Sequence, residues 1–132
     1  MFKRLDHVAI VVADTEAALQ IWRDRFGLPV LFAETINAGT VRLTHLDLGN
    51  THLQLVEPLT ADHPLATWLA AHGPGLHHLC LSVDDIDEAS MALPAHDLAP
   101  GEPEPHQGTQ GKRALFLDRG GTGNVQVELT GR

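Results

Sequence analysis

Two histidines stand at equivalent places in the two halves of this sequence, and each opens a short apolar stretch. His7 begins the stretch His-Val-Ala-Ile-Val-Val, and His78 begins the stretch His-Leu-Cys-Leu-Ser-Val 71 residues later. The same offset superposes Asp14 on Asp85. Self-similarity at a fixed offset indicates a duplicated structural unit. Because imidazole is a common ligand of divalent metals, the repeat predicts a pair of metal-binding histidines.

Each half also ends on a strand that carries an oxygen ligand. Gln54 follows His7 by 47 residues, and Glu128 follows His78 by 50. Both alternate with aliphatic residues, so each points to the face opposite the aliphatic row of its strand. If the halves pack as related modules, these four side chains converge on one site. Two imidazoles, one amide oxygen and one carboxylate suit a borderline divalent ion such as Co, Mn, Ni or Zn.

The other histidines and the single cysteine offer fewer ligands. A lone histidine on a strand is more often structural than a ligand, and it is the repeat that favours His7 and His78. His52 lies two residues before Gln54 on the same face, so it is an alternative ligand. Cys80 shares the face of His78 and is expected to line the pocket or to act as a small buried hydrophobe. Five histidines are expected at the solvated surface: His45, His63, His72, His96 and His106.

Apolar periodicity predicts the same order of elements in each half, namely strand, helix and three strands. In the first half we expect a helix over 15–26, started by Asp14 and ended by Gly27, and strands over 8–12, 29–32, 41–48 and 52–56. The segment 34–39 is expected to be a loop, and a linking helix is expected at about 63–73.

The second half is expected to repeat this plan. We expect a helix that starts at Asp84 or Asp85 and is ended early by Pro94. A loop over 99–111, with room for a short edge strand, separates strands over 78–83, 114–117 and 125–130. The predicted fold class is α+β, with two tandem βαβββ modules, about 1–59 and 75–132, in one domain over 1–132. The modules would form a half-open cup of mixed β-sheet with the helices outside.

Charge and cysteine content limit the partners and the compartment. The chain has 17 acidic and 9 basic residues and a net charge of −8, which argues against nucleic acid or a membrane surface as a general partner. The basic pair Lys112 and Arg113 can still meet one phosphate. With a single cysteine, no internal disulfide can form, and a cytoplasmic location is expected. We expect neither a signal peptide nor a membrane-spanning segment.

Several stretches together resemble the vicinal oxygen chelate superfamily of glyoxalase I, extradiol dioxygenases, bleomycin-resistance proteins and methylmalonyl-CoA epimerases. The strongest is Gly-Leu-His-His at 75–78 followed by Val-Asp-Asp-Ile-Asp at 83–87. Weaker matches lie at 6–9, 51–59, 66–70, 108–113 and 127–130. The resemblance extends over essentially the whole chain, and the chain is most similar to the methylmalonyl-CoA epimerases.

The resemblance implies an isomerase that epimerises methylmalonyl-CoA or a similar acyl-CoA thioester. Such an enzyme abstracts the proton alpha to the thioester and stabilises the resulting enolate. The family's metal ligands fall on His7, Gln54, His78 and Glu128, which is the set found from the repeat. The resemblance further implies that Glu128 is one catalytic base, and we expect Lys112 and Arg113 to bind substrate.

The sequence departs from the family pattern at the position of the second base, and also at 117–120, where the family's usual proline and lysine are missing, and at Pro94, which shortens the second helix. The resemblance implies a second acidic residue on the strand over 41–44, where Arg42 stands in this sequence. The nearest acidic residues are Glu34 and Asp47, and no motif places either of them. The identity of the second base is therefore open, as are the native substrate and the native metal.

Two other functions remain open. The first is a lyase like glyoxalase I (lactoylglutathione lyase), which would use the same metal site on a hemithioacetal. The second is a metal-free binding protein of the bleomycin-resistance type, although the few aromatic residues argue against it. A dioxygenase is disfavoured because its two-His, one-carboxylate iron site does not need Gln54. Open sheet edges predict a homodimer, and the ligands could come from one chain or two.

Overall fold

The computed structural model describes all 132 residues and divides into two compact units. The first-half unit is residues 7–77, and the second-half unit is residues 1–6 with 78–132. The first strand, β1 (Arg4–Val11), begins in the second-half unit and continues into the first-half unit. Within the second-half unit, Lys3 N–H donates to the carbonyl of Ser82 over 2.9 Å.

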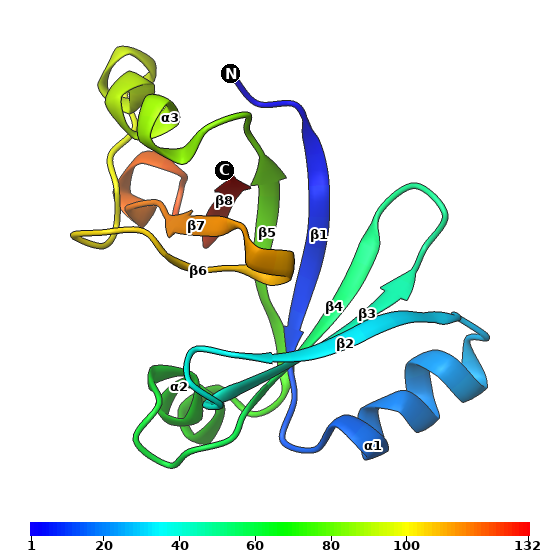
Figure 1. Cartoon of the computed structure of the whole chain (residues 1–132). Helices are drawn as coiled ribbons and strands as arrows, with labels where there is room; N and C mark the ends of the chain where they lie inside the picture. The colour runs from blue at the N-terminus through cyan, green and yellow to red at the C-terminus, as the bar shows by residue number, and fades with distance from the viewer. The chain divides into compact units, whose positions relative to one another are not determined.

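The first-half unit has the predicted order of elements (Figure 1). These are β1 (Arg4–Val11), α1 (Thr15–Leu19), which continues as a π-helix (Gln20–Arg25), β2 (Val30–Ile36), β3 (Val41–Asp47), β4 (His52–Pro58) and α2 (Pro64–His72). Its strands are ordered β2-β3-β4-β1. The β1–β4 pair is parallel and the other two pairs are antiparallel.

The second-half unit repeats this plan. Its elements are β5 (Gly75–Ser82), α3 (Ile86–Ala92), β6 (His106–Gln107), β7 (Arg113–Phe116) and β8 (Val127–Gly131). The strand order is β5-β8-β7-β6, with β5 and β8 parallel and the other pairs antiparallel. Two βαβββ modules with mixed strand pairing confirm the predicted α+β fold class.

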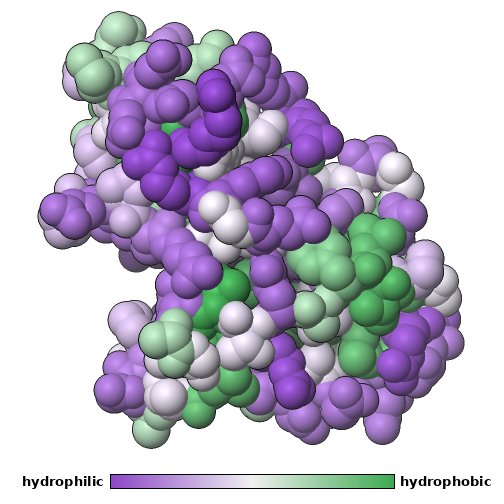
Figure 2. Space-filling view, in the orientation of Figure 1, coloured by the Kyte–Doolittle hydropathy of each residue, from purple (hydrophilic) through white to green (hydrophobic).

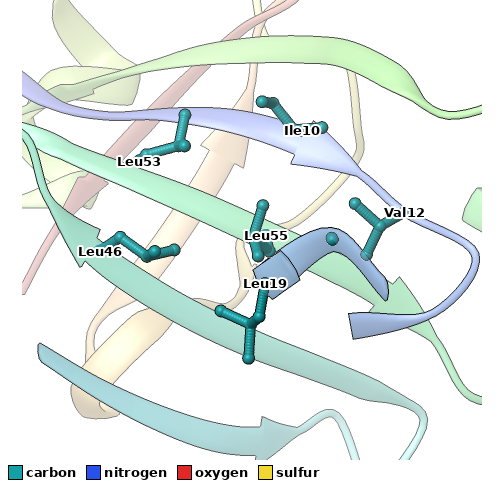
Figure 3. Packing of buried hydrophobic residues seen from close by; sticks show 7 residues of the cluster. Ile10, Val12, Leu19, Leu46, Leu53 and Leu55 are labelled. Atoms are coloured by element: carbon teal, nitrogen blue, oxygen red, sulfur yellow. The ribbon is translucent and has the colours of Figure 1, made fainter. Parts of the chain in front are cut away.

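Alternation along β1 divides the core of the first-half unit between two faces of its strands. On one face Ile10 and Val12 pack with side chains from α1, β3 and β4, seen close by in Figure 3: Leu19, Leu46, Leu53 and Leu55. On the other face Ala9 and Val11 pack with Ile36, Val41, Leu43 and Val56. Leu65, Trp68 and Leu69 of α2 are partly buried against this second cluster. Beyond the apolar cluster, the second face continues to His7.

Helix ends follow the sequence signals. Asp14 accepts the N–H of Glu16 over 3.3 Å, and Gly27 ends the helical segment at φ 74°, a value that favours glycine. Asp85 accepts the N–H of Glu88 over 3.0 Å at the start of α3. As predicted, Pro94 keeps this helix short, because α3 stops at Ala92 and a 3₁₀ turn follows.

The structure differs from expectation at the segment 34–39 and at His63. The segment 34–39 is not all loop, because β2 continues through Glu34 to Ile36 and pairs with β3. His63 is half-buried, and its Nδ1 accepts the N–H of Leu65 at the start of α2. Two of the histidines expected at the surface, His72 and His96, are exposed.

The visible surface is mostly polar, as the charged residues of the sequence lead one to expect. The face in Figure 2 is largely hydrophilic, and hydrophobic side chains gather there in separate areas. No helix is both long enough and apolar enough to cross a membrane.

Candidate metal centre

In the second-half unit, the sequence-predicted pair His78 and Glu128 lies side by side. His78 Nε2 is 3.4 Å from Glu128 Oε1, and the two side chains are only 6% and 10% exposed. The ring of His78 also meets Phe116 edge-on, with centroids 5.3 Å apart. Parallel pairing of β5 and β8 brings the two residues together, because Cys80, two residues after His78, is the register partner of Glu128. A buried imidazole beside a buried carboxylate is a donor pair that suits a divalent ion.

A third residue, His106, completes a polar chain in this unit. His106 Nε2 lies 3.0 Å from Glu128 Oε2, and its Nδ1 lies 2.9 Å from the carboxylate of Glu102. Burial lowers the pKa of His106, but the hydrogen bonds and charges of Glu128 and Glu102 outweigh it, so the pKa is raised. The expectation that His106 is solvated surface is wrong, because these two carboxylates hold it in a half-buried position.

In the first-half unit, His45 joins His7 to Gln54. His7 and Gln54 are 1% and 4% exposed. Gln54 Nε2 lies 3.0 Å from His45 Nε2, and the rings of His7 and His45 meet edge-on with centroids 5.4 Å apart. His45 is fully buried, so the expectation that it lies at the surface is wrong. Its Nδ1 is 3.0 Å from Nδ1 of His52, and its ring stacks on Phe32 at 4.4 Å.

His52, the alternative ligand, is therefore a neighbour of His45 in this structure. It is half-buried, whereas Gln54 is buried. His52, His45 and Gln54 form a hydrogen-bonded series, with half-buried His52 at one end and buried Gln54 at the other. Gln54 is for this reason the better ligand candidate of the two.

The two units use the same strand register to place their oxygen side chains. Ala9 faces Gln54 in the β1–β4 pair, and Cys80 faces Glu128 in the β5–β8 pair; Cys80 follows Ala9 by the same 71 residues by which His78 follows His7. On the antiparallel side His45 faces Gln54 and Phe116 faces Glu128, and Phe116 again follows His45 by 71 residues, whereas Glu128 follows Gln54 by 74. The duplication inferred from the sequence therefore extends to the pairing of individual residues.

The departure at Arg42 has a structural explanation. Arg42 is exposed and alternates with Val41 and Leu43, which belong to the buried cluster on the His7 face. Position 42 therefore projects from the opposite face of the strand. Of the two nearby acids, Asp47 accepts the N–H of Gly49 over 2.7 Å in a turn. Glu34 is half-buried and is the register partner of Leu43.

The predicted substrate-binding residues lie at the start of β7. Both Lys112 and Arg113 are half-buried. The Arg113 guanidinium makes two bonds of 3.0 and 3.1 Å to Asp87 and a third of 3.0 Å to the carbonyl of Arg132. This pairing with Asp87 raises the pKa of Arg113, so the group stays charged.

Cys80 is buried beside Glu128 in the second-half unit. Burial raises the pKa of the fully buried Cys80 thiol, and the charge of Glu128 raises it further, so the thiol stays protonated. Cys80 is thus a small buried residue, as one of the two expectations had it.

The second-half unit also has a pocket of about 590 Å³. It is lined by residues around the β7–β8 connection: Gly101, Phe116, Leu117, Asp118, Arg119, Gly120, Asn124 and Gln126.

Comparisons with known proteins agree with the resemblance seen in the sequence. Residues 6–116 match the family model described as the Glyoxalase/Bleomycin resistance protein/Dioxygenase superfamily. The chain is 36% identical over 127 residues to the mitochondrial methylmalonyl-CoA epimerase of Homo sapiens, covering 96% of this chain and 72% of the relative. It is also 36% identical over 131 residues to an ethylmalonyl-CoA/methylmalonyl-CoA epimerase of Cereibacter sphaeroides, covering 98% of each.

A solved structure shows the same similarity in three dimensions. A variant of the Streptomyces coelicolor methylmalonyl-CoA epimerase, in complex with 2-nitronate-propionyl-CoA, superposes with a TM-score of 0.87 at 30% identity. The match covers 99% of this chain and 95% of that one. The resemblance to this superfamily, and within it to the methylmalonyl-CoA epimerases, is thereby confirmed.

Proposed function

We propose that this chain, which belongs to the glyoxalase/bleomycin resistance protein/dioxygenase superfamily, is a metal-dependent epimerase of methylmalonyl-CoA or a similar acyl-CoA thioester. The observation that carries the proposal is the similarity to methylmalonyl-CoA epimerases over nearly the whole chain. Fold alone would be insufficient, since one fold hosts several chemistries. The buried polar groups described above supply the chemistry.

We place His7, Gln54, His78 and Glu128 as the ligands of one divalent ion: Co, Mn, Ni or Zn. The donor chemistry fits, because each unit offers one buried imidazole and one buried oxygen side chain on the same strand pair. When bound, such an ion supplies Lewis-acid stabilisation of negative charge on the substrate's oxygens.

Glu128 is the proposed first catalytic base. Its carboxylate would accept the proton from C2 of the substrate, and the electron pair of the broken C–H bond would move into the enolate of the thioester. A proton returned to the opposite face of C2 then gives the other epimer. Because Glu128 is buried, its carboxylate is shielded from competing water, which favours transfer to and from carbon.

Glu34 is our candidate for the second acid–base group. It lies two residues from both Phe32 and Ile36, which contact His45 and the cluster around Ala9 respectively. It therefore shares a face with the residues around Gln54, whereas Arg42 does not. Asp47 is the weaker candidate, because its carboxylate already accepts a backbone N–H in a turn.

Lys112 and Arg113 are proposed to contact a phosphate or carboxylate of the acyl-CoA. Asp87 and the carbonyl of Arg132 hold the Arg113 guanidinium in place, so it would act as a fixed charge. Lys112 is a flexible point charge that can follow the ligand. Substituting Lys112 with Ala should raise KM more than it lowers kcat.

Deuterium uptake at C2 of (2R)-methylmalonyl-CoA in D₂O tests the proposed function. We expect uptake with Co²⁺ that is lost with a chelator and falls strongly in Glu128→Gln, which keeps the size of the side chain but cannot accept the proton. A Glu104→Gln variant, changed at an exposed acid of the same unit, is the matched control. If the Co²⁺-loaded protein shows no uptake, the substrate is wrong, and a glutathione hemithioacetal would be tested next.

We also propose a homodimer and a cytoplasmic location, with a small thioester as the partner and neither nucleic acid nor membrane. Sedimentation would test the dimer, and a monomer at micromolar concentration would refute it. We further propose that residues 1–132 form a single domain, and cooperative unfolding in one transition would support this.

A further inference from the structure

Two side chains, Glu102 and His106, link the backbone of β7 to the carboxylate of Glu128. The N–H of Phe116 donates to Glu102 Oε2 over 2.7 Å. Glu102 accepts from Nδ1 of His106 over 2.9 Å, and His106 Nε2 lies 3.0 Å from Glu128 Oε2. The backbone N–H of Phe116 thus holds the Glu102 carboxylate, and Glu102 in turn holds the imidazole of His106.

The imidazole of His106 is restrained in its plane as well as along this chain. Its ring stacks on Phe116 with centroids 5.1 Å apart and an interplanar angle of 21°. Glu102 and His106 are separated by the sequence Pro-Glu-Pro, and proline restricts the backbone on both sides of Glu104. The loop therefore presents the two side chains from a stiffened segment.

His106 engages one oxygen of Glu128 and leaves the other for His78. Oε2 is bonded to His106, whereas Oε1 lies 3.4 Å from His78 Nε2. A glutamate side chain has three torsions, and a bond to one oxygen settles which oxygen points to the partner. Hydrogen bonds of this kind to a ligating carboxylate orient the ligand and tune its basicity.

We propose that His106, held by Glu102, is a positioning residue that fixes the Glu128 carboxylate with Oε1 toward the metal. The inference rests on the proposed metal site. The first-half unit contains a counterpart, because His45 holds the Gln54 amide and stacks on Phe32. The order of the stacked pair is exchanged: histidine is on β3 and phenylalanine on β2, whereas phenylalanine is on β7 and histidine on β6. In both units the histidine reaches the oxygen side chain.

The test uses His106→Phe, which keeps a ring to stack on Phe116 but removes both hydrogen bonds. The measurement is the Kd of the full chain for Co²⁺, from the visible absorption of the ion or competition with a chelating dye. We expect a Kd that is about 10–100-fold higher, the usual effect of losing such a partner of a ligand. His106→Gln, whose amide can donate to Oε2, should recover part of the affinity. His96→Phe, at an exposed position of the same unit, should bind as the parent does.

A second variant guards against loss of folding. Glu102→Gln keeps an acceptor for the N–H of Phe116 but removes the charge that orients His106, so its Kd should rise by a smaller factor. Urea midpoints measured alongside report folding separately from metal binding. In epimerase assays at saturating Co²⁺, His106→Phe should lower kcat with little change in KM, because the substrate contacts remain.

The outcomes separate this inference from the proposed function. Parental Co²⁺ affinity in folded His106→Phe or Glu102→Gln overturns the inference, and so does a parent chain that binds no Co²⁺. A second outcome is that the parent chain does not exchange deuterium into methylmalonyl-CoA, yet its His106→Phe variant binds Co²⁺ more weakly than the parent. This outcome refutes the proposed substrate and supports the role of His106.

Discussion

Replacing His45 with Phe should destabilise the first-half unit although it opens no cavity. His45 is fully buried, and a phenyl ring of similar size can keep the stacking on Phe32. What is lost is the pair of 3.0 Å contacts to Gln54 and His52. Water can reach half-buried His52, but Gln54 is only 4% exposed, so its amide N–H would stay unsatisfied.

An unsatisfied buried polar group costs about 1–3 kcal/mol, and this sets the expected loss in the free energy of unfolding. Urea unfolding followed by circular dichroism measures it. With an m-value of about 1–3 kcal/mol/M, the midpoint should fall by roughly 1 M while m stays constant. His72→Phe, on the exposed side of α2, is the control and should change stability by less than about 0.5 kcal/mol.

An unchanged midpoint in His45→Phe would refute this reasoning. It would mean that the Gln54 amide finds another partner at no cost, and that the series Gln54, His45 and His52 is not a structural unit. A lower midpoint with a lower m would instead indicate a changed denatured state, and the free energy would then need a second probe.

Three further predictions concern elements away from the candidate ligands. Glu57→Ala should lower the free energy of unfolding by about 1–3 kcal/mol in urea titrations, because Glu57 accepts both the N–H and the hydroxyl of buried Thr15, over 2.9 and 2.6 Å; equal stability would contradict this. Gly131→Ala should lower the midpoint of thermal unfolding, because a Cβ there would lie 2.5 Å from the carbonyl oxygen of Val83. An unchanged midpoint would show that the backbone around Val83 moves away at no cost. The N–H of Glu88 lowers the pKa of Asp85, so this carboxylate stabilises the folded state above its ordinary pKa of 3.8, and the benefit is lost as pH falls through the lowered value. The stability difference between parent and Asp85→Asn should accordingly be constant near neutral pH and shrink in acid, and a difference independent of pH would count against the cap.

The sequence was a good guide wherever alternation along a strand could be read. Alternation predicted that Gln54 and Glu128 lie on the strand face opposite the aliphatic row, and in the structure this face is also buried, as are His7 and His78. The same rule would have found His45, since it lies on the same buried face of β3 as Val41 and Leu43. Its type, a polar histidine among eight others, led to the wrong expectation of exposure.

Other features depend on contacts that no local pattern carries. His106 lies in a segment of prolines and glycines without periodicity, and its burial comes from contacts with Glu102, Glu128 and Phe116. Glu34 to Ile36 form a strand by pairing with β3, and the β-branched residues Thr35 and Ile36 favour it, so the expectation of a loop over 34–39 gave these two residues too little weight. The π-helical turns after Leu19 likewise have no signal in the sequence that we can identify.

The β7–β8 connection shows where this protein can change in length without losing its chemistry. Nine residues separate the facing pair His45 and Gln54 in the first hairpin, and twelve separate the facing pair Phe116 and Glu128 in the second. The three extra residues lie in a glycine-rich loop that contains Gly123 at φ 63° and contributes to the wall of the 590 Å³ pocket. Because register is set in the strands, insertions in this loop reshape the pocket and leave the position of Glu128 unchanged. The loop is thus a natural place to graft a new ligand specificity while Glu128, the proposed catalytic base, stays in position.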